Sequence, residues 1–304
     1  MKTDFLLAVV LIVCLAGAVA VTHSLTQHRE DMANTPHEEQ LYLNGRSARR
    51  LSLAFNGLVA DWYWMRSLQY VGGKVVRYED DHNGQFDLTS LQTLDLRLLP
   101  SLLDVTTTLD PQFIPAYQYG AVILPEINTE AAITLLHKGI AANPTSWRLH
   151  QHLGYIYWQR NDYARASEVY EAGAKLPGAP AWVAAMAARM KAEGGSREAA
   201  REMYQRLAEN SEDKTVKEMV AAQLMRLDSL EQRDAIRHIL RYFEMYSREH
   251  RCPSSWRAVV GELRREGLRL DPATGAPLDP SGIPYRIINS GCDVDLDPIS
   301  KVPR

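Results

Sequence analysis

Apolar residues recur at helical spacing through most of the chain, and in its middle the pattern itself repeats. Three blocks of 34 residues follow one another without a gap, at 113–146, 147–180 and 181–214. Superposing the blocks aligns small residues with small and large with large. The matching sets are Gly120, Gly154 and Ala188; Ala132, Ala166 and Ala200; and Leu136, Tyr170 and Tyr204. A repeat of this length predicts helix pairs that stack on one another.

These blocks resemble the tetratricopeptide repeat (TPR) family. The second block matches best, with Leu153-Gly154, Tyr157, Ala166 and Tyr170 at the family's positions and Asn161-Asp162-Tyr163 at its inter-helix turn. The other two blocks depart from the pattern, at Ala116 and Tyr119 in the first and at Lys191 in the third. The resemblance implies a helical solenoid whose concave face binds a peptide or a partner helix. We expect His150 and Tyr157 to take part in such binding.

Flanking segments extend the predicted array to residues 85–250. The stretch 98–111 predicts a lone second helix that ends at its proline. The stretch 216–250 predicts a further helix pair, with Ala222 and Ala235 near the positions of close contact.

An aromatic-rich segment, 38–73, precedes the array and predicts one long helix that stops at Gly72-Gly73. Leu51, Phe55, Leu58, Trp62 and Met65 form one apolar stripe at spacings of four and three, with Trp64, Leu68 and Val71 beside it. We expect Trp62 and Met65 to be buried against neighbouring helices, because a helix apolar on several sides is normally covered. Tyr63, Arg66 and Tyr70 then remain for a partner. Docking on a membrane or another protein, and a ligand site, are the alternatives for this helix.

The N-terminus carries a stretch of 18 uncharged residues, 5–22. Its length is near the lower limit for spanning a bilayer. It also resembles a signal peptide, since Ala18-Val19-Ala20 fits the small-x-small cleavage pattern. We favour an uncleaved anchor, residues 1–22, because apolar residues continue up to the possible cleavage site. A buried core helix is the remaining alternative. Residues 23–37 are expected to be a linker.

The C-terminal segment, 251–304, is rich in Pro, Gly and Asp and predicts a small α+β module with a β-hairpin. It resembles the C-terminal part of type II secretion major pseudopilins through Pro253-Ser254-Ser255, Asp279-Pro280-Ser281-Gly282, Pro284-Tyr285 and Ser300. The chain lacks the glutamate that such proteins carry in their N-terminal helix, so we do not expect a pilus subunit. That family's module can hold calcium, and the weak candidates here are Asp293, Asp295 and Asp297.

Cysteine usage agrees with export. Cys252 and Cys292 are an even pair outside the apolar N-terminal stretch, and disulfides persist in extracytoplasmic compartments. We therefore expect these two residues to pair, with two free thiols as the alternative.

Charge and motifs exclude several function classes. The net charge is −3, which leaves no basic footprint for nucleic acid. The sequence contains no HExxH, GxGxxG or GxSxG motif, and Gly72-Gly73-Lys74 lacks the other residues of a phosphate-binding loop. We expect no catalysis, cofactor or metal.

The sequence thus predicts a mostly α protein: a TPR-like helical solenoid behind an N-terminal membrane helix, ending in a small α+β module. Its expected place is the inner membrane, as a single-pass protein with the soluble part on the periplasmic side. Its expected role is a scaffold that binds other proteins of the cell envelope during assembly of a complex. The alternatives are a structural or accessory part of a type II secretion or pilus-like machine, and an envelope enzyme with an aromatic-lined groove.

Overall fold

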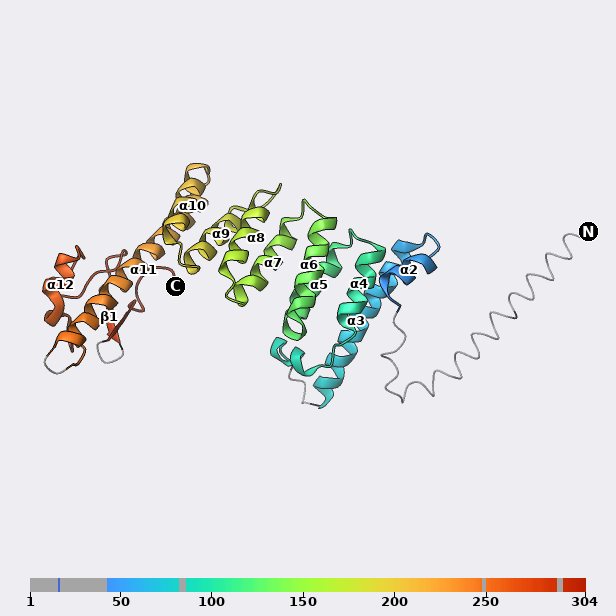
Figure 1. Ribbon diagram of the computed structural model, residues 1–304, viewed down its shortest axis with the longest axis horizontal. Helices are drawn as coiled ribbons and strands as arrows, with labels where there is room; N and C mark the ends of the chain where they lie inside the picture. Colours follow the sequence, from blue (N-terminus) through green and yellow to red (C-terminus); the bar gives the residue numbers. More distant parts are fainter. Residues whose placement is uncertain (1–15, 17–42, 82–85, 248–249, 289–291) are drawn as a thin grey trace, which may run out of the picture. The chain divides into compact units, whose positions relative to one another are not determined.

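The computed structural model describes residue 16 and residues 43–81, 86–247, 250–288 and 292–304, and most of them are helical (Figure 1). Nearly all of the predicted anchor, 1–22, and the whole linker, 23–37, lie outside the described residues. Among the helices that are described, none has both the length and the apolarity needed to cross a bilayer.

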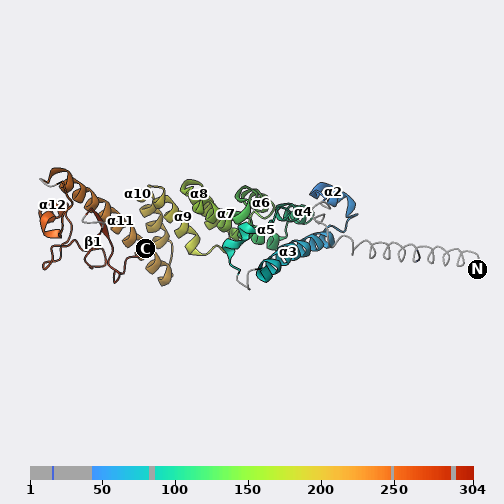
Figure 2. The same ribbon diagram turned by 90° about the horizontal axis from the view of Figure 1, so that it is seen from below.

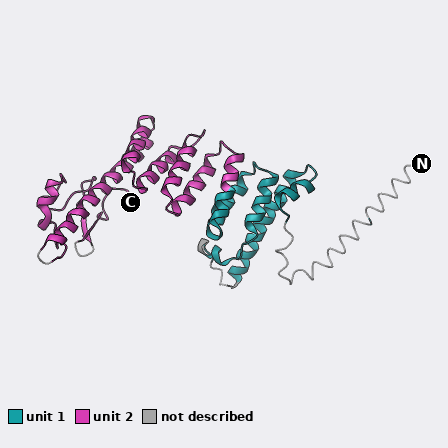
Figure 3. Ribbon diagram, viewed as in Figure 1, with its two compact units in different colours: residues 1–135 teal, residues 136–304 magenta. Residues whose placement is uncertain are grey.

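The chain forms two compact units, residues 1–135 and residues 136–304 (Figure 3). The boundary falls inside helix α6, Thr129–Ala142, within the array that the repeats predict. Each helix of a repeat array touches only its neighbours, so one array can be divided between two units.

Unit 1 is built around helix α4, Leu99–Leu109, which is buried along most of its length. Helices α2, Gly45–Leu51, and α3, Asn56–Asp81, pack against α4 on one side, and α5, Ile114–Ile127, also contacts it. A 3-10 helix, η2, Leu88–Thr93, joins α3 to the rest. Pro100 lies in the first turn of α4 and Pro111 lies just beyond its end. A helix tolerates proline at both positions.

The repeats fold as helix pairs, which makes this part of the chain TPR-like. The first block holds α5 and α6, the second α7, Trp147–Gln159, and α8, Tyr163–Ala174, and the third α9, Ala181–Glu193, and α10, Arg197–Glu209. In unit 2, α7 to α10 lie side by side in chain order (Figures 1 and 2).

Small residues set how closely these helices approach one another. A Cβ atom added at Gly154 would lie 2.8 Å from the ring of Tyr170, so that ring occupies the space left by the missing side chain. In the third block Ala188 and Tyr204 occupy the same positions, and both are buried. Ala132, Ala166 and Ala200 have no exposed surface. The predicted close-contact positions are confirmed.

The predicted helix pair at 216–250 is wrong, because one continuous helix, α11, Lys214–Tyr246, occupies most of this range. The helix contains neither glycine nor proline, so nothing in its sequence interrupts it. Ion pairs hold α11 against α10, with Arg197 2.6 Å from Asp234 and Arg201 3.0 Å from Glu231.

The C-terminal module packs against α11. A 3-10 helix, η3, Trp256–Val259, leads into α12, Val260–Arg265, and strands β1, Arg286–Ile288, and β2, Asp293–Asp295, pair antiparallel. Tyr285 is buried and its hydroxyl lies 3.0 Å from both the Ser229 hydroxyl and the Gln232 side-chain oxygen on α11. The module shares one hydrophobic core with the last turns of that helix.

The predicted single helix at 38–73 is also wrong. The chain leaves the helix after Leu51, turns through residues 52–55, and enters α3 at Asn56. The helix then continues past Gly72 and Gly73 to Asp81. Each glycine costs a helix about 1 kcal/mol relative to alanine. Tertiary contacts beyond them favour continuation, since Lys74 bonds the Asp95 carbonyl and the Tyr78 ring lies 6.1 Å from that of Phe86.

Candidate functional site: an aromatic surface on α7 and α9

Aromatic rings collect on the first helices of the second and third repeats. We define the α7–α9 aromatic surface by Trp147, Tyr155, Trp158, Trp182 and Arg189. The rings of Trp147 and Trp182 lie 5.9 Å apart at 80°, which joins α7 to α9 edge to face. Those of Tyr155 and Trp158 lie 5.7 Å apart at 75°. Such geometry is favourable for aromatic pairs, so the rings are held in place before anything binds.

These rings are only partly covered. Tyr155 is 45% exposed and Trp182 38% exposed, while Trp147 and Trp158 are half-buried. Trp, Tyr and Arg are the residue types that dominate the energy of protein interfaces, because a rigid ring loses little entropy when it is covered. A partly covered aromatic row is therefore suited to bind another polypeptide.

Arg189 adds a cation to the surface. Its guanidinium lies 5.3 Å from the centre of the Trp158 ring, a cation–π distance. Its Nε atom is buried and donates no hydrogen bond among the described residues, although the Glu193 carboxylate lies 3.7 Å away. The Arg189 side chain is thus held by the Trp158 ring and the Glu193 carboxylate, and its positive charge lies beside the rings.

The repeat residues predicted for partner binding lie differently. Tyr157 is 5% exposed, its hydroxyl lies 3.4 Å from Nε2 of His137, and Arg165 stacks on its ring at 4.9 Å. His150 hydrogen-bonds the Ser146 carbonyl at 3.2 Å and packs against Gly173 on α8. Tyr157 belongs to the core, so its assignment to a binding face is corrected. The neighbouring tyrosine, Tyr155, lies on the exposed side of the same helix.

The predicted orientation of α3 is wrong as well. Tyr63 is 6% exposed, whereas Trp62 is 54% and Met65 52% exposed. The side that packs against α4 carries Ala60 and Ser67, both without exposed surface. Small residues allow two helices to approach closely, and Tyr63 packs between them in one cluster with Leu102 and Val105 of α4.

Arg66 and Tyr70 have partners within the chain. The Arg66 guanidinium lies 5.3 Å above the Trp62 ring. Tyr70 donates a hydrogen bond to the Asp95 carbonyl at 3.0 Å and therefore ties α3 to the segment before α4. Trp64, on the second predicted stripe, packs 5.3 Å from Tyr119 and 5.7 Å from Phe113. Burial raises the pKa of Tyr119 to about 12, as expected in an apolar cluster.

Six exposed apolar residues result on α2, on the turn after it and on α3. We call this set the α2–α3 apolar face; its exposed fractions are Leu51 65%, Leu53 80%, Phe55 66%, Leu58 70%, Trp62 54% and Met65 52%. Leu53 and Ala54 have φ values of 46° and 77°, in the left-handed region. Such a conformation costs roughly 1–3 kcal/mol for a residue other than glycine and clusters at functional sites.

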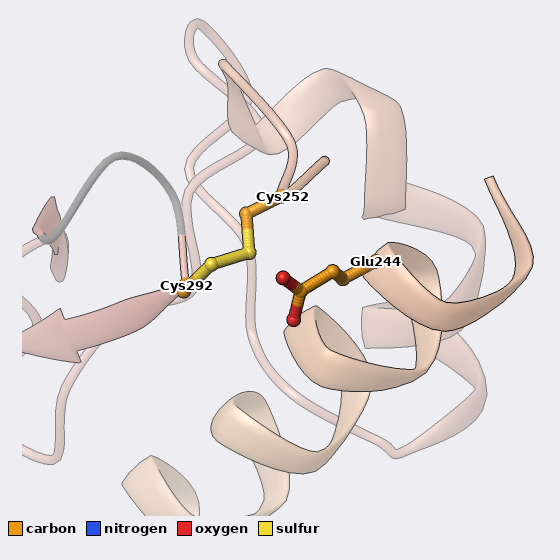
Figure 4. A group of neighbouring side chains, drawn as sticks. All are labelled: Glu244, Cys252 and Cys292. Atoms are coloured by element: carbon orange, nitrogen blue, oxygen red, sulfur yellow. A yellow bond between two sulfur atoms is a disulfide. The ribbon is translucent and has the colours of Figure 1, made fainter. Parts of the chain in front are cut away.

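The two cysteines predicted to pair are joined by a disulfide, with Cα atoms 5.1 Å apart. The Glu244 carboxylate points toward the two sulfurs (Figure 4), and the ligand atoms of all three residues lie within 4.8 Å of one another. Sulfurs in a disulfide are not thiolates and do not act as ordinary metal ligands. With a sequence separation of 40 between its cysteines, the disulfide stabilises the module by about 4 kcal/mol in the chain-entropy model.

The weak calcium candidates are engaged in other contacts within the chain, which count against that assignment. Asp293 accepts a hydrogen bond from Arg237 at 2.7 Å, and Asp295 lies 3.6 Å from Arg233. The Arg237 side chain lowers the pKa of Asp293 through this bond. Asp297 accepts a bond from the backbone of Ile299 at 3.1 Å. These carboxylates serve to attach β2 to α11 and to shape the turn after it.

No family model matches the chain, and no curated protein matches it. A solved structure named "MamA MSR-1 C2" is similar over 48% of this chain and 96% of that chain, with 16% sequence identity and a TM-score of 0.30.

Proposed function

We propose that this protein is a membrane-anchored, TPR-like scaffold that binds other proteins of the cell envelope through the α7–α9 aromatic surface. The observation that carries the proposal is the prearranged row of partly exposed rings, Trp147 with Trp182 and Tyr155 with Trp158, beside the Arg189 guanidinium. Envelope location is supported by the uncharged stretch 5–22 and by the Cys252–Cys292 disulfide.

The chemistry of the surface indicates the kind of partner. Rings that are partly exposed favour apolar side chains, and the Arg148 and Arg189 guanidinium groups stack on Trp147 and Trp158. Carboxylates of a partner would be attracted to the positive charge of these two guanidinium groups. The expected ligand is therefore a peptide segment or helix that combines apolar and acidic residues.

We propose a non-enzymatic role. The sequence carries none of the common catalytic motifs, and the partly exposed aromatic residues of α7 and α9 suit contact rather than chemistry. The enzyme alternative relied on an aromatic groove along α3. It loses support because Trp62 lies on an open face and Trp64 packs against Phe113 and Tyr119.

A role beside a secretion or pilus-like machine is a second candidate. One observation favours it: the chain passes from the long helix α11 into a short helix and an antiparallel hairpin that packs back on α11, in the order that the pseudopilin resemblance implies. Co-purification with filament components of such a machine would support this candidate.

The test is co-purification of the full-length protein from detergent, with a double variant of the aromatic surface, Tyr155→Ala and Trp182→Ala. Loss of a hot-spot residue costs about 2 kcal/mol or more, which is about thirtyfold in affinity, so specific partners should disappear. The matched control is Glu171→Ala with Lys175→Ala, an exposed ion pair on α8. Partners retained by the double variant, or lost equally from the control, would contradict the proposal.

A further inference from the structure

We propose that the α2–α3 apolar face docks on the surface of an anionic phospholipid bilayer. This inference rests on the proposed membrane attachment through residues 5–22, and concerns a second contact with the same membrane. The face shares no residue with the α7–α9 aromatic surface and needs no protein partner.

The apolar residues of this face gather around a turn. Leu51 ends α2, Leu53 and Phe55 lie in the turn, and all three are at least 65% exposed. Hydrogen bonds fix the turn, from the Ser52 hydroxyl to the Arg49 carbonyl at 2.9 Å and from the Phe55 backbone to the Ser52 carbonyl at 2.8 Å. The side chains are thus presented by a defined backbone.

One side of α2 is buried against α4, and this determines which side of the helix faces outward. Gly45 and Ala48 are buried, and a Cβ atom on Gly45 would lie 2.8 Å from the side chain of Thr108 on α4. The opposite side of α2 therefore points outward and carries Arg46, Arg49 and Arg50, all exposed.

Charge complementarity selects an anionic surface. From Leu43 to Ala60 the chain contains three arginines and no Asp, Glu or Lys. The first acidic residue after Leu43 is Asp61. Apolar side chains with flanking arginines and a tryptophan are typical of segments that lie in the interfacial region of a bilayer. Basic residues there are attracted to anionic headgroups.

The proposed anchor lies a short stretch of chain away from the face. Twenty residues separate Thr22, the end of the uncharged stretch, from Leu43. Fully extended they span at most about 70 Å. An anchor at 5–22 would thus keep α2 close to the bilayer and raise its local concentration there.

Lipid is favoured over a partner helix because of where the apolar residues lie. A helix-binding seam follows one helix at spacings of three and four. Leu58, Trp62 and Met65 lie on α3 at such spacings, but Leu53, the most exposed residue of the face at 80%, and Phe55 at 66% belong to the turn before it. A fluid interface can accept such a projecting turn.

The test places a nitroxide spin label at Leu53→Cys in the full-length chain, in a Cys14→Ser background, reconstituted into phosphatidylcholine vesicles with or without phosphatidylglycerol. Collision rates with oxygen and with a water-soluble nickel chelate report the surroundings of the label. A label at Glu168→Cys, an exposed site on α8, is the matched control. A label on native Cys14 in the otherwise unchanged chain reports the anchor.

With phosphatidylglycerol, the ratio of oxygen to nickel collisions at position 53 should exceed that at position 168 severalfold. Replacing Arg46, Arg49 and Arg50 with glutamine should remove most of that difference. If Cys14 lies in lipid but position 53 collides mainly with nickel, the docking inference fails. It fails equally if position 53 is shielded from both reagents, as a protein contact would produce. If Cys14 itself is in water, the failure belongs to the proposed anchor.

Discussion

Helices α3 and α8 both carry large aromatic residues at helical spacing, yet they place them on opposite sides. Helix α8 turns Tyr170, 2% exposed, into the gap left by Gly154 on its neighbour. Helix α3 turns Ala60 and Ser67 toward α4 and leaves Trp62 more than half exposed. On α8 the large side chain enters the helix contact because the facing helix offers a glycine, whereas the α3 stripe that carries Trp62 faces no helix that covers it.

The two candidate surfaces also differ in how far their large side chains are covered. On α7 and α9 the rings contact one another and are partly covered, as in a site prepared for a polypeptide. On α2 and α3 the apolar residues spread over a turn and lie beside three arginines. One protein thus presents a ring-lined surface and a basic, apolar one, and these suit different partners.

The largest expected effect is the removal of a ring from the repeat core. Tyr170→Ala should lower the free energy of unfolding by about 3–5 kcal/mol, because the cavity beside Gly154 is left unfilled. Trp62→Ala, on the exposed face, should change it by no more than about 0.5 kcal/mol. Urea titrations followed by circular dichroism measure both. Similar losses in the two variants would show that Trp62 is covered in the isolated protein.

A smaller effect, of opposite sign in the two regions, is expected from replacing glycine by alanine. Gly154→Ala should destabilise the protein by about 1–3 kcal/mol, since the new methyl group would overlap the Tyr170 ring. Gly72→Ala on α3 should stabilise it by about 1 kcal/mol. No atom lies within 4 Å of the added Cβ there. Thermal unfolding of each variant is the measurement, and equal signs would contradict the comparison.

The smallest expected effect is a pH dependence in the repeat. Burial lowers the pKa of His152 on α7, because the charged imidazolium is poorly solvated there. The unfolded chain then binds the proton more readily, so stability present above about pH 6.5 is lost as the pH falls. His152→Gln should flatten this decline in melting temperature between about pH 7 and pH 5. Parallel curves for the variant and the natural protein would rule out a contribution from His152.

Much of the fold follows from sequence alone. The 34-residue period located three helix pairs, and the aligned small residues identified where the helices touch, because both depend on spacing along the chain. The even pair of cysteines predicted the bridge between residues 252 and 292. Helix ends were less predictable: α3 continues through Gly72 and Gly73 since contacts with distant residues outweigh local preference.

The candidate sites depended far more on tertiary structure. The sequence determined that Leu58, Trp62 and Met65 share one stripe, since that follows from 3.6 residues per turn. It did not determine that this stripe is the exposed one. Only the packing of α4 against Ala60 and Ser67 decided it, and likewise only the approach of α9 to α7 brought Trp182 to Trp147. Periodicity is a property of one helix, whereas burial depends on a second helix that the local sequence does not specify.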